Sequence, residues 1–175
     1  GGGTCYPIEI IDSIASIAKK NDCKSHIDGA RIFNSSIATG LDVSRLSKNF
    51  DSISICLSKG LGAPIGSVLV GSKEMIDKAY RWRKMFGGGM RQVGIIASAG
   101  LYALENNIER LSKDHERALI LGEAIDSMNN YSVNMDQIQT NMVYVNCIGD
   151  NSSELVTKLS EKGTDVLSID DSSIR

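Results

Sequence analysis

The sequence predicts an α/β protein, with a mostly parallel sheet in its first part and part of a smaller α/β domain at its end. Two observations support this class. Short runs with β-branched residues and alternating polar and apolar side chains recur along the chain, as is typical of strands. Segments with apolar residues at helical spacing lie between them. The 175 residues, 42% of them hydrophobic, suffice for one domain with a core or for one domain plus part of another.

The first elements are defined by local signals. Pro7 suits the first turn of a helix, because its missing N–H would be unpaired there anyway. Apolar residues then recur at helical spacing as far as Lys20. We expect a short strand at residues 24–28, a small helix at 42–48 and a strand at 51–57.

The alternation continues through the middle of the chain. A strand is expected at residues 66–70. Ser72 is a suitable N-cap for a helix that reaches about Met85, since its hydroxyl can accept a backbone N–H. After a glycine run, a helix of small residues is expected at 92–105 and a longer, charged helix at 108–129.

The pattern changes towards the end of the chain. A strand is expected at 141–147, a helix at 152–162 and a strand at 164–168. We therefore expect residues 1–112 to be the C-terminal part of a large domain and residues 113–175 an incomplete small domain. The chain lacks an initiator methionine, and we expect it to be an internal segment of a longer protein.

Charge and composition argue against several classes of protein. The net charge is −2, and no basic stripe is interleaved with aromatic residues, so nucleic acid is not expected as a partner. No apolar run reaches the roughly 18 residues that span a bilayer, and no signal peptide is recognised. The four cysteines match no zinc-binding pattern, so no metal is expected. Reduced cysteines in a cytoplasmic protein are the plain interpretation.

Lys59 is the strongest chemical signal. It follows the strand expected at 51–57 and lies in the glycine-rich segment SKGLGAP, where backbone can approach a ligand closely. We expect this lysine to be buried, because a desolvated amine loses its proton more easily and becomes the nucleophile of a Schiff base. The alternative is a solvated loop lysine.

Asp28 ends the strand expected at 24–28, and Arg31 lies three residues further along the chain. A carboxylate beside a pyridine nitrogen keeps that nitrogen protonated, and Asp28 is the candidate for this role. The alternative is a turn aspartate before Gly29. A guanidinium binds a carboxylate through two parallel hydrogen bonds, so Arg31 is a candidate for the α-carboxylate of an amino-acid substrate. The alternative is a surface ion pair.

Two further residues are candidates for binding a phosphate. Arg91 follows three glycines and precedes an expected helix, whose N-terminus would attract anions. Ser58 can offer its hydroxyl to the same group. Glycine-rich turns also occur simply to reverse the chain. The lysine, the aspartate and the arginines together suggest pyridoxal 5'-phosphate (PLP) as the cofactor.

Three segments carry a resemblance to a known family: HIDGARIFNSS (26–36), DSISICLSKGLGAPIGSVLVGS (51–72) and RKMFGGGMRQVG (83–94). In this order and spacing they resemble the threonine aldolases, which are PLP-dependent enzymes with the aspartate-aminotransferase-like fold (fold type I). The resemblance implies that residues 1–112 belong to a PLP-binding large domain.

The resemblance also implies roles for single residues. Lys59 would carry PLP as a Schiff base, and Asp28 would pair with the pyridine nitrogen. Arg31 would bind the substrate carboxylate. Arg91 matches an arginine near the cofactor phosphate, and Arg175 aligns with a late arginine of the small domain that also binds the substrate carboxylate.

The activity implied is retro-aldol cleavage of L-threonine, L-allo-threonine and related β-hydroxy-α-amino acids to glycine and an aldehyde. Members of the family are usually homotetramers, so a homo-oligomer (tetramer or dimer) acting in cytoplasmic amino-acid metabolism, in threonine catabolism and glycine biosynthesis, is expected. The catalytic base stays unassigned. Two alternatives remain: another β-eliminating lyase or an aminotransferase with the same fold and cofactor, or an inactive truncated fragment.

Overall fold

A computed structural model describes residues 2–175 and divides the chain into two compact units. One unit runs from Tyr6 to Leu111, and the other combines Ser112–Arg175 with the residues up to Cys5. Among residues 2–175, no helix has both the length and the hydropathy needed to cross a membrane.

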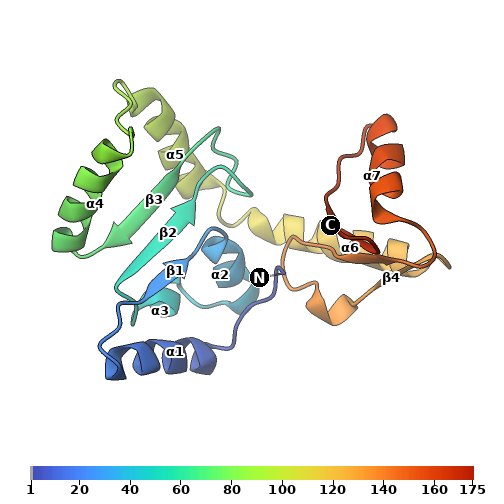
Figure 1. Cartoon of the computed structure of the whole chain (residues 1–175), viewed down its shortest axis with the longest axis horizontal. Coiled ribbons are helices and arrows are strands. Elements are labelled where there is room, and N and C mark those ends of the chain that lie inside the picture. The colour runs from blue at the N-terminus through green and yellow to red at the C-terminus, as the bar shows by residue number, and fades with distance from the viewer. Residues whose placement is uncertain (1) are drawn as a thin grey trace. The chain divides into compact units, whose positions relative to one another are not determined.

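The first unit is built on a sheet of three strands in the order β1-β2-β3, with β1 at His26–Asp28, β2 at Ser52–Cys56 and β3 at Ser67–Gly71 (Figure 1). β1 and β2 are parallel, whereas β2 and β3 are antiparallel. The described part of this sheet therefore has one parallel and one antiparallel pair. The helices of this unit are α1 (Ile8–Lys20), α2 (Ile32–Thr39), α3 (Val43–Ser47), α4 (Lys73–Met85) and α5 (Gly94–Asn106).

Two groups of buried side chains hold the first unit together. Ile53 of β2 packs with Ile32 of α2 and Leu46 of α3, which fixes these helices against the sheet. The second group lies beyond the end of β2 and consists of Leu57, Leu61, Ala63, Ala103 and Leu111. It joins the loop after β2 to α5 and to Leu111, the first residue of α6 (Leu111–Asp126).

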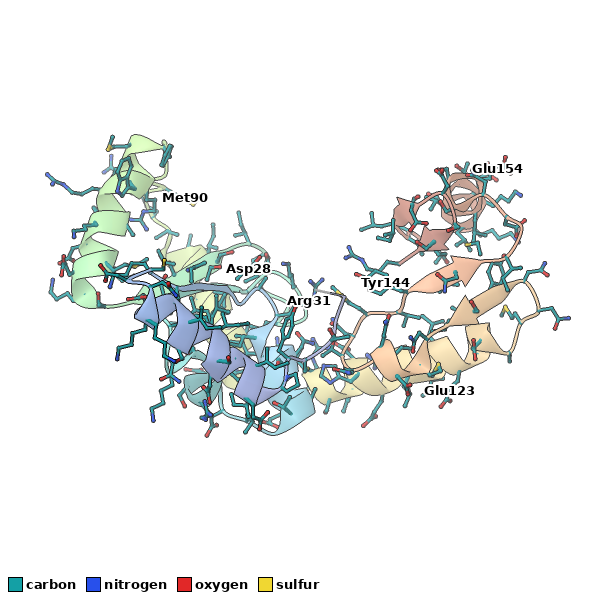
Figure 2. The ribbon with its side chains drawn as sticks, turned by 60° about the horizontal axis from the view of Figure 1, so that its bottom comes forward. Asp28, Arg31, Met90, Glu123, Tyr144 and Glu154 are labelled. Atoms are coloured by element: carbon teal, nitrogen blue, oxygen red, sulfur yellow. The ribbon has the colours of Figure 1, made fainter. Side chains whose placement is uncertain are left out.

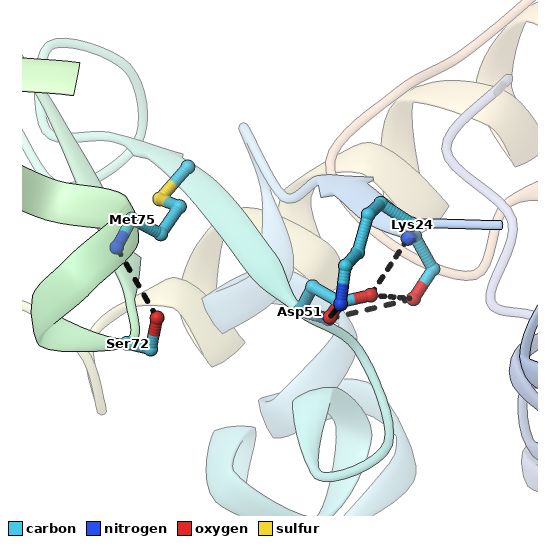
Figure 3. Close-up of polar contacts among 5 residues, drawn as sticks. Lys24, Asp51, Ser72 and Met75 are labelled. Carbon is cyan, nitrogen blue, oxygen red and sulfur yellow. Dashed lines mark hydrogen bonds and ion pairs between the residues drawn. The ribbon is translucent and has the colours of Figure 1, made fainter. Parts of the chain in front are cut away.

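Polar contacts fix where the strands and helices begin. The Asp51 carboxylate accepts the backbone N–H of Ser25 at 2.9 Å and the Lys24 ammonium at 3.0 Å, so the residues before β1 and β2 are tied together (Figure 3). The same figure shows the N-cap of α4, where Met75 N donates to Ser72 Oγ at 3.3 Å. This cap confirms the prediction from the sequence.

The second unit contains four strands, β4 (Tyr131–Val133), β5 (Val145–Cys147), β6 (Ser168–Asp170) and β7 (Ser173–Ile174). They form an antiparallel sheet in the order β4-β5-β7-β6. Its apolar core includes Val133, Val145, Cys147 and Ile174. All four cysteines of the chain are free. The other elements of this unit are α6 from Ser112 onwards, the 3-10 helix η1 (Met135–Gln137) and α7 (Ser152–Glu161).

The predicted α/β class is confirmed, and so are most of the predicted helices. The strand expected at 164–168 is wrong, because this segment closes the C-terminal end of α7. Gly163 has a φ of +80°, and Thr164 N donates to Leu159 O at 2.9 Å. The strand itself begins only at Ser168. Helix α2 and strands β4 and β7 were not predicted.

Candidate active site

Two loops of the first unit leave the sheet at the same edge. β1 ends at Asp28 and β2 at Cys56, and the two strands run parallel with Asp28 opposite Ser54. Ligands of α/β proteins bind outside the carboxyl ends of such strands. Asp28 is the last residue of β1 and Arg31 follows it (Figure 2), while Ser58 and Lys59 follow β2. The parallel register thus brings four predicted site residues to one edge of the sheet.

A tight turn defines the backbone around Lys59. Gly62 N donates to Lys59 O at 2.8 Å, and Ala63 N donates to Leu57 O at 3.0 Å. Gly62 has a φ of +78°, which residues with a Cβ rarely adopt. We call residues 57–63, which these hydrogen bonds close, the Lys59 turn.

The Lys59 side chain is exposed, so the prediction that it is buried is wrong for this chain. The reason lies in the turn itself. Leu57 and Leu61 occupy the buried positions, with exposures of 9% and 3%, while Ser58 and Lys59 face solvent. The apolar neighbours of Lys59 anchor the turn rather than cover the amine. The amine is therefore accessible at the edge of the sheet.

Asp28 is exposed and takes part in a turn. Its Oδ1 accepts the backbone N–H of Ala30 at 3.2 Å, which is the turn role weighed as the alternative from the sequence. Gly29 is required by packing, because a Cβ there would lie 2.9 Å from the backbone oxygen of Ser54. The close approach of this loop to β2 holds the Asp28 carboxylate at the carboxyl edge of the sheet.

Arg31 carries an unsatisfied polar atom. Its Nε is buried without a hydrogen-bond partner, and none of the ion pairs among residues 2–175 includes Arg31. A buried donor without an acceptor costs about 1–3 kcal/mol, and more when the group is charged. An anionic ligand at this edge would remove that cost. This orphaned donor fits a carboxylate-binding role better than the surface ion pair weighed as the alternative.

Two predicted site residues, Arg91 and Arg175, do not belong to the loops that follow β1 and β2. Arg91 is exposed and lies three residues before the start of α5. Lys84 Nζ lies 3.0 Å from the position that a Cβ at Gly89 would occupy, so a second cation approaches the glycine run before Arg91. Arg175 lies in the second unit, where its backbone pairs with Leu167.

Sequence reasoning missed two residues that hold the Lys59 turn. Asn107 Nδ2 donates to Leu61 O at 2.7 Å, and Arg110 donates to Gly60 O at 3.1 Å. Both come from the end of α5 and the segment after it, more than forty residues along the chain. No local pattern in the sequence could have indicated these contacts.

Comparison with known proteins decides the family. Residues 1–148 match the family of beta-eliminating lyases.

The chain belongs to the beta-eliminating lyase family.

Relatives within the beta-eliminating lyases confirm the resemblance to threonine aldolases. The probable low-specificity L-threonine aldolase 2 of Arabidopsis thaliana is 51% identical over 144 residues, which cover 82% of this chain and 41% of that protein. The low specificity L-threonine aldolase of Escherichia coli K12 is 42% identical over 153 residues, which cover 87% of this chain and 45% of that protein. The chain thus spans less than half the length of these curated relatives.

A solved structure confirms the predicted fold class. A putative L-allo-threonine aldolase from Listeria monocytogenes matches 97% of this chain, and 49% of its own length, with a TM-score of 0.82. Its sequence identity is 20%, so this likeness concerns the fold alone. The chain therefore shares the fold of about half of that protein.

Proposed function

We propose that a protein containing this chain is a PLP-dependent aldolase. It cleaves L-threonine, L-allo-threonine and related β-hydroxy-α-amino acids to glycine and an aldehyde. The observation that carries the proposal is the accessible Lys59 on a defined turn, at the same sheet edge as Asp28 and Arg31. The 51% identity to a probable low-specificity L-threonine aldolase supports this choice of reaction.

The residues at this edge fit PLP and its substrate. Lys59 would hold the cofactor through its amine, and Asp28 would keep a proton on the ring nitrogen. Ser58 and Arg91 would bind the phosphate group. Arg31, whose Nε lacks a partner, supports the fit because it needs an anion. When bound, PLP supplies a ring that accepts the electron pair released at the substrate Cα.

The substrate would be oriented by its carboxylate. Arg31 would bind the carboxylate through two parallel hydrogen bonds, together with Arg175 of the small domain. A base would take the β-hydroxyl proton while the Cα–Cβ bond breaks, and the former hydroxyl carbon leaves as the aldehyde carbonyl. The electron pair of the broken bond then binds a proton at Cα, which gives glycine. The base is not among the residues assigned here.

Two broader features belong to the same proposal. The enzyme would act in the cytoplasm on a small amino acid, and it would be a homo-oligomer, either a tetramer or a dimer. The large domain would hold PLP through residues 1–112, and the small domain would begin at residue 113. Size-exclusion chromatography with light scattering on the full-length protein would test the assembly.

Product analysis tests the reaction. The full-length protein incubated with PLP and L-threonine should release glycine and acetaldehyde in equal amounts, and Lys59→Ala should abolish this release. Lys73→Ala is a matched control, because Lys73 is an exposed lysine whose ion pair to Asp77 lies on α4. Ammonia plus a keto acid would instead indicate β-elimination, and a keto acid without ammonia would indicate transamination. Aldehyde release by the folded Lys59→Ala variant at the wild-type rate would refute the assignment.

A further inference from the structure

The C-cap of α5 and the segment after this helix supply two hydrogen bonds to the Lys59 turn. Asn107 Nδ2 donates to the carbonyl of Leu61 at 2.7 Å, and the Arg110 guanidinium donates to the carbonyl of Gly60 at 3.1 Å. These carbonyls belong to the two residues that directly follow Lys59. Asn107 is partly buried, whereas Arg110 is exposed, so the Asn107 contact is the better shielded from water.

The turn does not satisfy these two carbonyls by itself. Its own hydrogen bonds are accepted by the carbonyls of Lys59 and Leu57. Glycines at positions 60 and 62 flank Leu61 and give this backbone more conformational freedom than other residues would. Ordering a backbone with two glycines costs more conformational entropy, so contacts from outside the turn help to keep one conformation.

Apolar packing places Asn107 accurately relative to the turn. Ala103 of α5 is 1% exposed and belongs to the same buried group as Leu57 and Leu61. A Cβ at Gly100 would lie 3.0 Å from Leu57 Cδ1, so α5 approaches the turn closely there. Asn107 directly follows this helix and is its C-cap. Its amide is therefore a donor held at a fixed place.

We infer that Asn107 is a positioning residue for Lys59. By binding the Leu61 carbonyl, it holds the turn in the conformation that presents the Lys59 amine at the sheet edge, with Arg110 as a weaker second contact. The inference rests on the proposed function, in which Lys59 carries PLP. It concerns how this lysine is held and adds no group to the reaction itself.

The test uses the full-length protein and two readouts. The first is the dissociation constant of PLP. It is measured from the absorbance of bound PLP that depends on Lys59 and is therefore missing in Lys59→Ala. The second is amide hydrogen exchange at Gly62 and Ala63 without cofactor, because these amides close the turn. Asn107→Leu removes the donor and keeps the number and branching of the side-chain heavy atoms, and Asn107→Gln keeps an amide. Asn106→Leu is the matched control, since Asn106 Nδ2 bonds only within α5, to Tyr102 O.

Asn107→Leu should weaken PLP binding about tenfold, the scale of one lost hydrogen bond, and speed exchange at both amides by a similar factor. Asn107→Gln should recover part of the affinity, and Asn106→Leu should match the wild type in both readouts. If folded Asn107→Leu binds PLP within twofold of Asn106→Leu, the inference is refuted. If Asn107→Leu does not fold, Arg110→Met replaces it, with about a threefold loss expected and no loss refuting the inference. A wild type without Lys59-dependent absorbance would refute the proposed function instead.

Discussion

Gly29→Ala should destabilise the first unit and also disturb the carboxyl edge of the sheet, where the predicted site residues lie. An added Cβ would lie 2.6 Å from Ile53 Cδ1 and 2.9 Å from the backbone oxygen of Ser54. The isoleucine side chain can rotate, but the Ser54 oxygen belongs to β2 and can move only with the strand. Overpacking of this kind costs about 1–3 kcal/mol, and the backbone contact places Gly29→Ala at the upper end of this range.

Urea denaturation of the full-length protein, followed by circular dichroism, would measure this cost. Gly94→Ala is the matched control, since a Cβ at Gly94 meets nothing within 4 Å and its φ is not in the left-handed region. This control should be neutral or up to about 1 kcal/mol more stable, because alanine lowers the entropy of the unfolded chain. If the free energy of unfolding of Gly29→Ala lay within about 0.5 kcal/mol of that of Gly94→Ala, the loop would not pack closely on β2 and the prediction would be refuted.

Three further changes test other parts of the structure. Ser72→Ala should cost about 1 kcal/mol in a urea titration, because it removes the side-chain acceptor for Met75 N, and Ser72→Asp should not. Leu61→Ala should cost about 2–5 kcal/mol and weaken PLP binding, because Leu61 is 3% exposed and anchors the Lys59 turn; a loss below about 1 kcal/mol would contradict this. The hydrogen bond from the Ser25 backbone, together with the Lys24 ion pair, lowers the pKa of the Asp51 carboxyl group. The ionised Asp51 carboxylate therefore stabilises the folded protein above the unfolded pKa of about 3.9, and this stabilisation disappears as the pH falls through the lower folded pKa. Asp51→Asn should therefore be less stable than wild type at pH 7, and urea midpoints should converge in acid; an undiminished gap there would refute the role of the charge.

Much of the fold could be predicted because its signals are local. Pro7 and Ser72 mark helix starts by chemistry that involves only the next few residues, and both helices begin where expected. β7 has two residues and β4 has three, too few for a periodic pattern to be recognised. Their place is set by pairing with distant strands.

The site was predictable in its residue types but not in its packing. Lys59, Asp28 and Arg31 stand out by their neighbours in the sequence, and the parallel pairing of β1 and β2 brings their loops to one edge. Exposure depends on which residues cover a side chain in space. The leucines on either side of Lys59 in the sequence therefore could not indicate whether its side chain is buried. Asn107 contacts a carbonyl 46 residues away, and no spacing rule connects the two.

The covalent attachment of PLP to Lys59 is the central claim, and borohydride reduction tests it most directly. The full-length protein would be loaded with PLP, reduced, digested and analysed by mass spectrometry. The account predicts a pyridoxyl group on the peptide that contains Lys59 and none on those containing Lys73 or Lys84. A stoichiometric label on another lysine, or no label on a protein that is folded and binds PLP, would contradict it.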